Sequence, residues 1–195
     1  MKTHVAIRRF CVLGLTTLLA SCTAMHSGNT SYGVSLGEIV KMPPEQATAA
    51  VSNWTIMTYD PGTFYCLPVG KYSSCTSTPG HGTQIEYFAP EGKAYLWYPK
   101  NPRAVRSFWR LARNGDTYSI CFKYPSRSYN PVTREHGGRW ECRLLAMLVS
   151  RITESRRGDI FRLVSGRLPF PLAAGETTFD TLLRQWGKAP APSTG

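Results

Sequence analysis

Strong turn signals between short alternating segments constrain this chain more than any other feature. Asn114-Gly115 is the dipeptide that most favours a two-residue hairpin loop, and Ala89-Pro90-Glu91-Gly92 places Pro second and Gly fourth, as a type I turn prefers. The segments that flank these turns are 83–88 with 93–98, and 106–112 with 117–124. Because tight turns join antiparallel neighbours, we predict a run of β-hairpins at the centre of the chain.

The Asn114-Gly115 turn also predicts a register. A two-residue loop at this dipeptide would set three pairs opposite each other: Arg113 and Asp116, Leu111 and Tyr118, and Trp109 and Ile120. One face would then be apolar, with Trp109, Leu111, Tyr118, Ile120 and Phe122. The other face would carry Phe108, Arg110, Ala112, Thr117, Ser119 and Cys121. This division indicates a half-buried sheet with an Arg–Asp pair at the hairpin tip.

The segments before these hairpins are less regular. Proline in a first helical turn followed by Glu45 predicts a short helix over 43–53. Residues 54–59 alternate as a strand does, whereas 61–82 are rich in turn residues and are expected to be held by a cysteine pair. Residues 22–42 are small and polar without a sustained period, so we expect a flexible tether there.

The segments after the hairpins end in a helix. Residues 139–149 and 159–164 are expected to be strands around Arg156-Arg157-Gly158, although 139–149 also fits a helical period. Apolar residues then recur at helical spacing at Phe179, Leu182, Leu183 and Trp186. Thr177 and Asp180 have the spacing of a capping box, so we expect the helix to begin there. Gly187 is expected to end the helix, and residues 187–195 are predicted to be a disordered tail.

Length and composition complete the predicted fold. A chain of 195 residues with 42% hydrophobic and 18% charged residues is suited to one globular domain, which we place at 43–186. We predict a mainly-β fold, either an antiparallel meander or a small barrel. Two disulfides, a short N-terminal helix and a C-terminal amphipathic helix complete it.

The N-terminus has the layout of an export signal. A basic start with Lys2, Arg8 and Arg9 precedes an apolar stretch over 10–19 and then Leu19-Ala20-Ser21-Cys22. This ending resembles the lipobox of bacterial lipoproteins, which implies cleavage of residues 1–21 and lipidation of Cys22. Thr23 in place of Asp after the cysteine favours the outer membrane, facing the periplasm. The alternative is an ordinary signal peptide or uncleaved anchor in which the cysteine is accidental.

Four cysteines then remain in the mature chain: Cys66, Cys75, Cys121 and Cys142. An even number in an oxidising compartment predicts two disulfides. Of the three possible connectivities we favour Cys66–Cys75 with Cys121–Cys142, because each closes a local loop. No C-x-x-C pair is present, so a structural zinc site is not expected.

The positive charge is concentrated in one half of the chain. Residues 100–167 contain two Lys and thirteen Arg against five acids, a net charge of +10. Arginine suits bidentate contacts with phosphate or carboxylate. Anionic lipid, lipopolysaccharide and peptidoglycan are therefore candidate ligands, whereas nucleic acid is not expected. The candidate anion-binding residues are Arg110, Arg143, Arg156, Arg157 and Arg162. The alternative is that these arginines bind no ligand and only make the surface of a β-sheet hydrophilic.

Signals for catalysis are weak. His81 and His136 lie in Gly-rich segments but lack the spacing of a metal or catalytic motif, and Asp60 is first of all a turn residue. No nucleophile elbow and no phosphate-binding loop occurs. We expect no cofactor and no metal, and we predict that Trp97, Trp109 and Trp140 belong to the core, with a ligand platform as the alternative.

The mature sequence loosely resembles small uncharacterised proteobacterial envelope proteins. The residues that carry the likeness are Trp109, Cys121, Trp140 and Cys142, and it covers only about residues 88–164. The resemblance supports the β-rich fold and implies no activity.

Three functions remain open from the sequence. The first is a non-catalytic envelope lipoprotein, a binding or accessory module with an Arg-rich face. The second is a small hydrolase of envelope polymers, and the third is an inhibitor or immunity-type lipoprotein. Convergence of His81, His136 and an acid in a pocket would favour the hydrolase. A protruding polar loop would favour the inhibitor, and a broad arginine face would favour the binding module.

Overall fold

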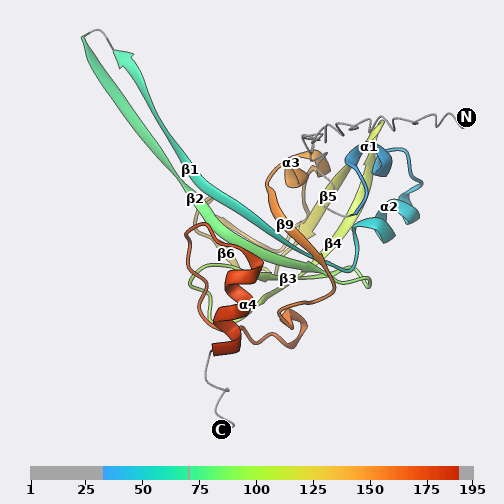
Figure 1. Ribbon diagram of the computed structural model, residues 1–195. Coiled ribbons are helices and arrows are strands. Elements are labelled where there is room, and N and C mark those ends of the chain that lie inside the picture. The colour runs from blue at the N-terminus through green and yellow to red at the C-terminus, as the bar shows by residue number, and fades with distance from the viewer. Residues whose placement is uncertain (1–32, 70, 189–195) are drawn as a thin grey trace, which may run out of the picture.

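A seven-stranded antiparallel sheet forms the framework of the computed structural model, which describes residues 33–69 and 71–188 (Figure 1). Its strands are β1 (Trp54–Val69), β2 (Tyr72–Phe88), β3 (Lys93–Trp97), β4 (Val105–Asn114), β5 (Thr117–Lys123), β8 (Glu141–Leu144) and β9 (Ile152–Arg157). The helices are α1 (Leu36–Ile39), α2 (Pro44–Val51), α3 (Leu145–Val149), the 3₁₀ turn η1 (Leu163–Ser165) and α4 (Phe179–Lys188). A separate small hairpin pairs β6 (Tyr129–Asn130) with β7 (Glu135–His136).

The strand order is β8-β5-β4-β3-β2-β1-β9, so the chain meanders from β1 through β5 to β8 and then returns to the other edge with β9. The short α3 connects the two edge strands, which do not pair with each other. The predicted mainly-β antiparallel fold is confirmed, and the meander rather than a closed barrel is the form it takes.

Both faces of the sheet are covered. Ile56, Phe88 and Trp109 belong to one buried cluster that includes residues of α1, α2 and α3, and we call this side the N-terminal face. Their neighbours along the strands, such as Met57 after Ile56 and Tyr87 before Phe88, belong to a second cluster. This cluster lies under α4 and the segment around η1, and we call this side the C-terminal face. Successive strand residues point to opposite faces, so the central strands have a nearly continuous apolar sequence.

The predicted tether at 22–42 is too long by ten residues, because 33–42 belong to the domain. Ser35 and Glu38 form a capping box at the start of α1, with the Glu38 carboxylate accepting from the Ser35 N–H at 2.7 Å. Ile39 is fully buried in the cluster of the N-terminal face. The helix predicted over 43–53 is confirmed as α2, which buries Ala47 and Val51. Residues 1–32, with the predicted signal and Cys22, lie outside the described residues.

The largest departure from the predicted fold is at 61–82. Instead of a compact turn-rich loop, β1 and β2 continue past the sheet as a two-stranded ribbon over residues 59–82, which we call the arm (Figure 1). A bulge marks its base, where Asp60 pairs with Gly82 but Gly62 pairs with Pro79. Gly and Pro at the bulge supply the turn-like composition, and beyond it the β2 strand is rich in Ser and Thr, so the ribbon forms no core of its own.

The first predicted hairpin turn is found as expected, and the second is displaced. The Gly92 N–H donates to the Ala89 carbonyl at 3.1 Å, which closes the turn between β2 and β3. Between β4 and β5 the loop is Gly115-Asp116, because Asn114 pairs with Thr117. A positive φ occurs there only at Gly115, as in a type II′ loop rather than the expected I′ loop.

The displaced loop changes which residues of β4 and β5 lie opposite each other, but it does not change which face of the sheet each residue is on. Trp109 lies opposite Phe122 and Leu111 opposite Ile120, so each residue remains on its predicted face. The predicted Arg113–Asp116 pair is wrong: Arg113 lies opposite Tyr118, with its guanidinium 5.1 Å from the centre of that ring.

Two elements near the C-terminus are also corrected. Residues 139–149 divide into strand β8 and helix α3, and the strand expected at 159–164 lies instead at 152–157, where it pairs with β1. Asp159 accepts hydrogen bonds from the Leu163 and Val164 N–H groups, which favours the η1 turn over a strand. The amphipathic α4 is confirmed, but Thr178 rather than Thr177 caps it, and it continues through Gly187 to Lys188. Residues 189–195 of the predicted tail lie outside the described residues.

Both predicted disulfides are present. Cys66–Cys75 joins β1 to β2 within the arm, and Cys121–Cys142 joins β5 to the edge strand β8. The first therefore stabilises a ribbon outside the core, and the second secures an edge of the core sheet.

These positions predict different effects of removing each bond. Replacing Cys121 and Cys142 by Ser should lower the free energy of unfolding by about 3 kcal/mol, the chain-entropy value for a loop of this size. Replacing Cys66 and Cys75 should leave the unfolding of the core nearly unchanged, because the opened arm gains the same freedom whether or not the core is folded. Urea titration measures the core stability of both variants, and limited proteolysis checks that the arm of the second variant has opened. Equal losses of core stability in the two variants would contradict this assignment.

Candidate functional site

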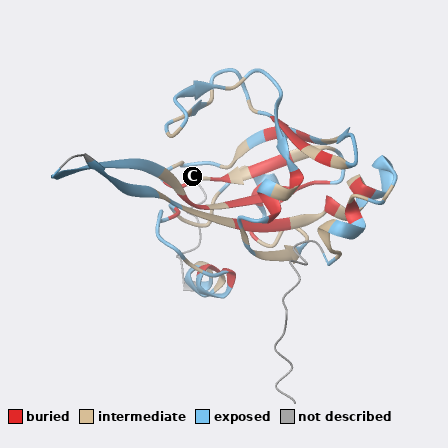
Figure 2. Ribbon diagram, turned by 90° about the horizontal axis from the view of Figure 1, so that it is seen from above, coloured by how far each residue is buried: buried red, intermediate tan, exposed pale blue. Residues whose placement is uncertain are grey.

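The arm exposes apolar side chains far from any core. Phe64 and Tyr72 are each 73% exposed, and Leu67 and Tyr65 are 58% and 49% exposed. Figure 2 shows the ribbon of the arm in the colour of exposed residues along most of its length. No described residue between Pro61 and His81 is buried. Exposed apolar groups that gather on one projecting element make the arm a candidate contact surface.

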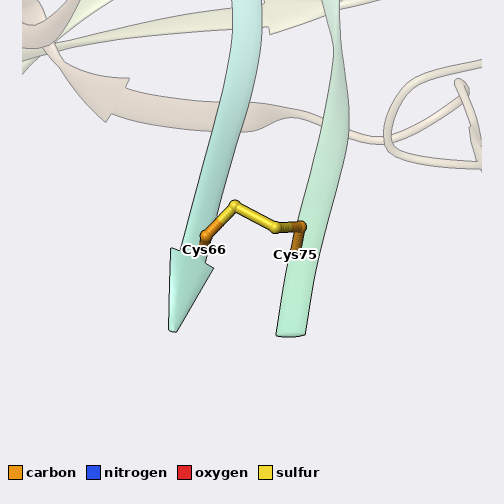
Figure 3. The surroundings of a disulfide bond; sticks show 2 residues. All are labelled: Cys66 and Cys75. Carbon is orange, nitrogen blue, oxygen red and sulfur yellow. A yellow bond between two sulfur atoms is a disulfide. The ribbon is translucent and has the colours of Figure 1, made fainter. Parts of the chain in front are cut away.

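The two faces of the arm differ. Residues that pair across antiparallel strands share a face, so Tyr65, Leu67 and Tyr72 lie on one face with Ser74 and Thr76. Phe64 and the Cys66–Cys75 bridge lie on the other. Figure 3 shows this bridge between the two strands. Between Asp60 and Glu86 the sequence contains no acidic residue, and Lys71 is its only Lys or Arg. The arm is thus a nearly uncharged ribbon with an aromatic face.

The base of the arm is built from close backbone contacts. A Cβ on Gly80 would lie only 2.1 Å from the Gly62 nitrogen, and a Cβ on Gly62 would meet the Thr78 carbonyl oxygen at 2.3 Å. On the C-terminal face, the Thr83 N–H donates to the Ala174 carbonyl at 3.0 Å. Only glycine permits such an approach, so the arm joins the sheet through a closely packed bulge.

A small polar cavity lies beside this base. It is lined by Ile56, Thr58, Asp60, His81, Gln84, Glu86, Leu96, Tyr124, Arg143, Leu148 and Arg151. Its volume is about 40 Å³, on the measure by which one water molecule needs roughly 10–15 Å³. The cavity can therefore hold a few waters.

Glu86 is the buried charged group of this cavity. It is only 6% exposed, and its Oε1 accepts a hydrogen bond from the Tyr124 hydroxyl at 3.3 Å. Burial raises the pKa of Glu86 to about 7, against the opposing effects of Arg143 and the Tyr124 hydrogen bond. Burial, followed by the nearby Glu86 charge, raises the pKa of Tyr124 well above its usual value. An acid within the apolar run 85–89 is the sequence signal that would identify Glu86, which is absent from the predicted site residues.

His81 lies at the edge of the cavity and His136 elsewhere. The His81 Nδ1 is 3.3 Å from the Tyr98 hydroxyl, and burial lowers the pKa of this histidine despite the nearby Asp60. His136 is exposed on β7, with its ring 5.1 Å from that of Tyr129. The convergence of both histidines that would favour a hydrolase is therefore not found. Within the described part of the chain, no group of three His, Cys, Asp or Glu residues could hold a metal ion.

The buried Glu86 predicts a pH-dependent stability. The folded chain holds this proton more tightly than the unfolded chain, whose pKa is near the ordinary 4.5, so wild-type stability should fall as pH rises from about 4.5 through about 7. Glu86→Gln should raise the free energy of unfolding by about 3 kcal/mol above pH 7.5 and change it little near pH 4.5. Urea titrations across this range measure the difference.

The matched control is Glu91→Gln, an exposed acid 3.7 Å from Lys93. It should have a small effect at every pH. A constant difference between Glu86→Gln and wild type from pH 4.5 to 8.5 would mean that Glu86 does not titrate in this range.

The five candidate arginines do not form one face. Arg156 and Arg157 are adjacent on β9 and so point to opposite faces, and Arg110 and Arg143 align with Cys121 and Ile120, which also face opposite ways. Each guanidinium lies over a ring: Arg110 over Trp140, Arg143 over Phe122, Arg156 over Phe179, Arg157 over Trp54 and Arg162 over Trp186. Cation–π contacts thus account for their local positions.

Two of these arginines hold α4, Arg156 from strand β9 and Arg162 from the start of η1. Arg156 donates to Asp180 at 2.7 Å, and this hydrogen bond holds the pKa of Asp180 below its usual value. Arg162 lies over Trp186 near the end of the same helix. Of the three tryptophans predicted to be core residues, Trp97 and Trp109 are buried, whereas Trp140 is 36% exposed under Arg110.

Comparison with known proteins does not identify a relative. The sequence matches no protein-family model, and no curated protein or solved structure is significantly similar to it. Among the described helices none is both long and apolar enough to cross a lipid bilayer. The candidate sites are therefore judged by their own geometry, which distinguishes the exposed arm from the small cavity.

Proposed function

We propose that this protein is a lipid-anchored, non-catalytic binding module of the bacterial cell envelope, and that the arm is its contact element. The arm supports this proposal because it presents exposed aromatic side chains on a ribbon already held in shape by a disulfide. A preformed element loses little conformational entropy on binding, which favours recognition. The Glu86 cavity supports a reaction less well, because it has room only for a few waters.

Two other functions expected from the sequence, inhibition of an enzyme and contact with an anionic envelope component, also remain proposals. An inhibitor-type lipoprotein would also present a projecting element, and in that case the partner would be an enzyme that loses activity on binding. Contact with an anionic envelope component remains a prediction from the net charge of +10 over residues 100–167. The distribution of Arg110, Arg143, Arg156 and Arg157 over both faces favours protein contact through the arm as the main interaction.

The anchor is tested at Cys22. Metabolic labelling with a palmitate analogue should tag the wild-type chain, and Cys22→Ala should abolish the label and move the protein from the membrane to the soluble fraction. Cys11→Ala is the matched control, because Cys11 would be removed with the signal. A mature protein that is unlabelled, or that starts at another residue, would contradict lipidation at Cys22.

The contact element is tested by photo-crosslinking in intact cells. A photoreactive p-benzoylphenylalanine at Leu67 on the arm should give a discrete covalent adduct, because this side chain is 58% exposed on the aromatic face. The same group at Val164, which is 50% exposed away from the arm, is the control and should give none. Equal adduct patterns at the two positions would rule out the arm as the contact element.

A further inference from the structure

The geometry of the arm reveals which backbone groups face outward. The Cα atoms of Cys66 and Cys75 are 4.0 Å apart, near the roughly 4.5 Å of a non-hydrogen-bonded pair rather than the roughly 5.5 Å of a hydrogen-bonded one. Because the two kinds of pair alternate, Phe64–Ser77 and Pro68–Ser73 are also non-hydrogen-bonded. Residues in such pairs direct their N–H and C=O groups away from the partner strand. Pro68, which has no N–H to give to a partner strand, fits this position.

The outer edge of β2 is the longer open edge of the arm. Among the described residues, β9 pairs with β1 only as far as Thr58, and β3 pairs with β2 only from Ile85, so neither reaches the arm. On β2 the outward groups belong to Ser73, Cys75 and Ser77, and each offers both a donor and an acceptor. The outward series on β2 ends at Pro79, whereas on β1 it ends at Pro68 and the Gly62 N–H already donates to the Asp60 carboxylate, so β1 offers fewer free groups. An open, uncharged edge of this kind is a template for another strand.

We propose that two copies of this chain pair antiparallel through the β2 edges of their arms, about a two-fold axis at Cys75. This proposal rests on the arm being the contact element. In this register Ser73 of each copy lies opposite Ser77 of the other, and the two Cys75 residues face each other. Each of these three pairs exchanges two backbone hydrogen bonds, so six bonds form.

The side chains and charges of the edge suit a second copy. Ser74 of one arm would lie beside Thr76 of the other, and small hydroxyl side chains pair favourably across strands. Lys71 would lie beside Pro79 of the second copy, which separates the two Lys71 residues by about eight strand positions, or roughly 27 Å. This exceeds the Debye length of about 8 Å at physiological salt, so the two charges do not oppose pairing.

Pairing also joins the aromatic faces. A two-fold axis perpendicular to the ribbon keeps the same face of both arms upward, in the order β1-β2-β2-β1. Tyr65, Leu67 and Tyr72 of both copies then form one apolar surface on a four-stranded sheet. A four-stranded ribbon is more stable than an isolated hairpin, which is marginal in water.

The test uses the full chain in its own membrane. p-Benzoylphenylalanine replaces Tyr72, which would lie beside Thr78 of the second copy, and two forms of the chain with tags of different length are co-expressed. We expect adducts of three sizes on irradiation, the two homodimers and the mixed dimer. Ser77→Pro removes an outward N–H and should reduce these adducts at least fivefold, whereas Ser77→Ala keeps the N–H and should not.

Proline at position 77 is compatible with the arm itself, because Pro79 already occupies an equivalent outward position. Detection of the intact Cys66–Cys75 bridge in Ser77→Pro verifies that the arm is formed. Undiminished dimer adducts in Ser77→Pro would overturn the proposed pairing. Adducts at Tyr72 or Leu67 with a different protein, and none with a second copy, would also overturn it while leaving the arm as contact element. Absence of adducts at both positions would overturn both proposals.

Discussion

The continuous pairing of β1 with β2 is the interaction on which the rest of the structure depends. From Trp54–Phe88 to Thr58–Gln84 this pair lies inside the sheet, with the edge strand β9 on one side and β3, followed by β4, β5 and β8, on the other. Its apolar residues alternate between the two covered faces, so Ile56 contributes to one core and Met57 to the other. The same two strands then leave the sheet and pair only with each other. Core and arm are therefore two parts of one hairpin.

The strength of the sequence prediction depended on how local each signal was. The helix at α2, the hairpin at Ala89–Gly92, the amphipathic α4 and both disulfides follow from a few neighbouring residues, and each was predicted. The assignment of the β4 and β5 residues to the two faces of the sheet was also correct. Moving the loop by one position shifts each cross-strand partner by two residues, which lies on the same face. The exact partners were wrong, since Gly115 alone takes a positive φ and moves the loop to Gly115-Asp116.

The arm and the cavity could not be found in the same way. Pro61, Gly62 and Gly80 have the composition of a loop, and only the pairing of Asp60 with Gly82 reveals them as a bulge inside a long hairpin. Glu86 gains its raised pKa from burial against segments more than thirty residues away, such as Tyr124. The arginines were predicted from charge alone, whereas their positions depend on which aromatic ring each one covers.

The arm buries no described side chain between Pro61 and His81, so the two parts of the hairpin are under different selective constraints. Substitutions in the core must preserve volume and polarity on both faces of the sheet. Substitutions on the arm, apart from its glycines and its cysteine pair, leave folding stability almost untouched. Under the proposed function, changes at a few arm residues alter the binding preference of the chain while its fold remains constant. Under the same proposal, folding and recognition are encoded in separate residues of one hairpin.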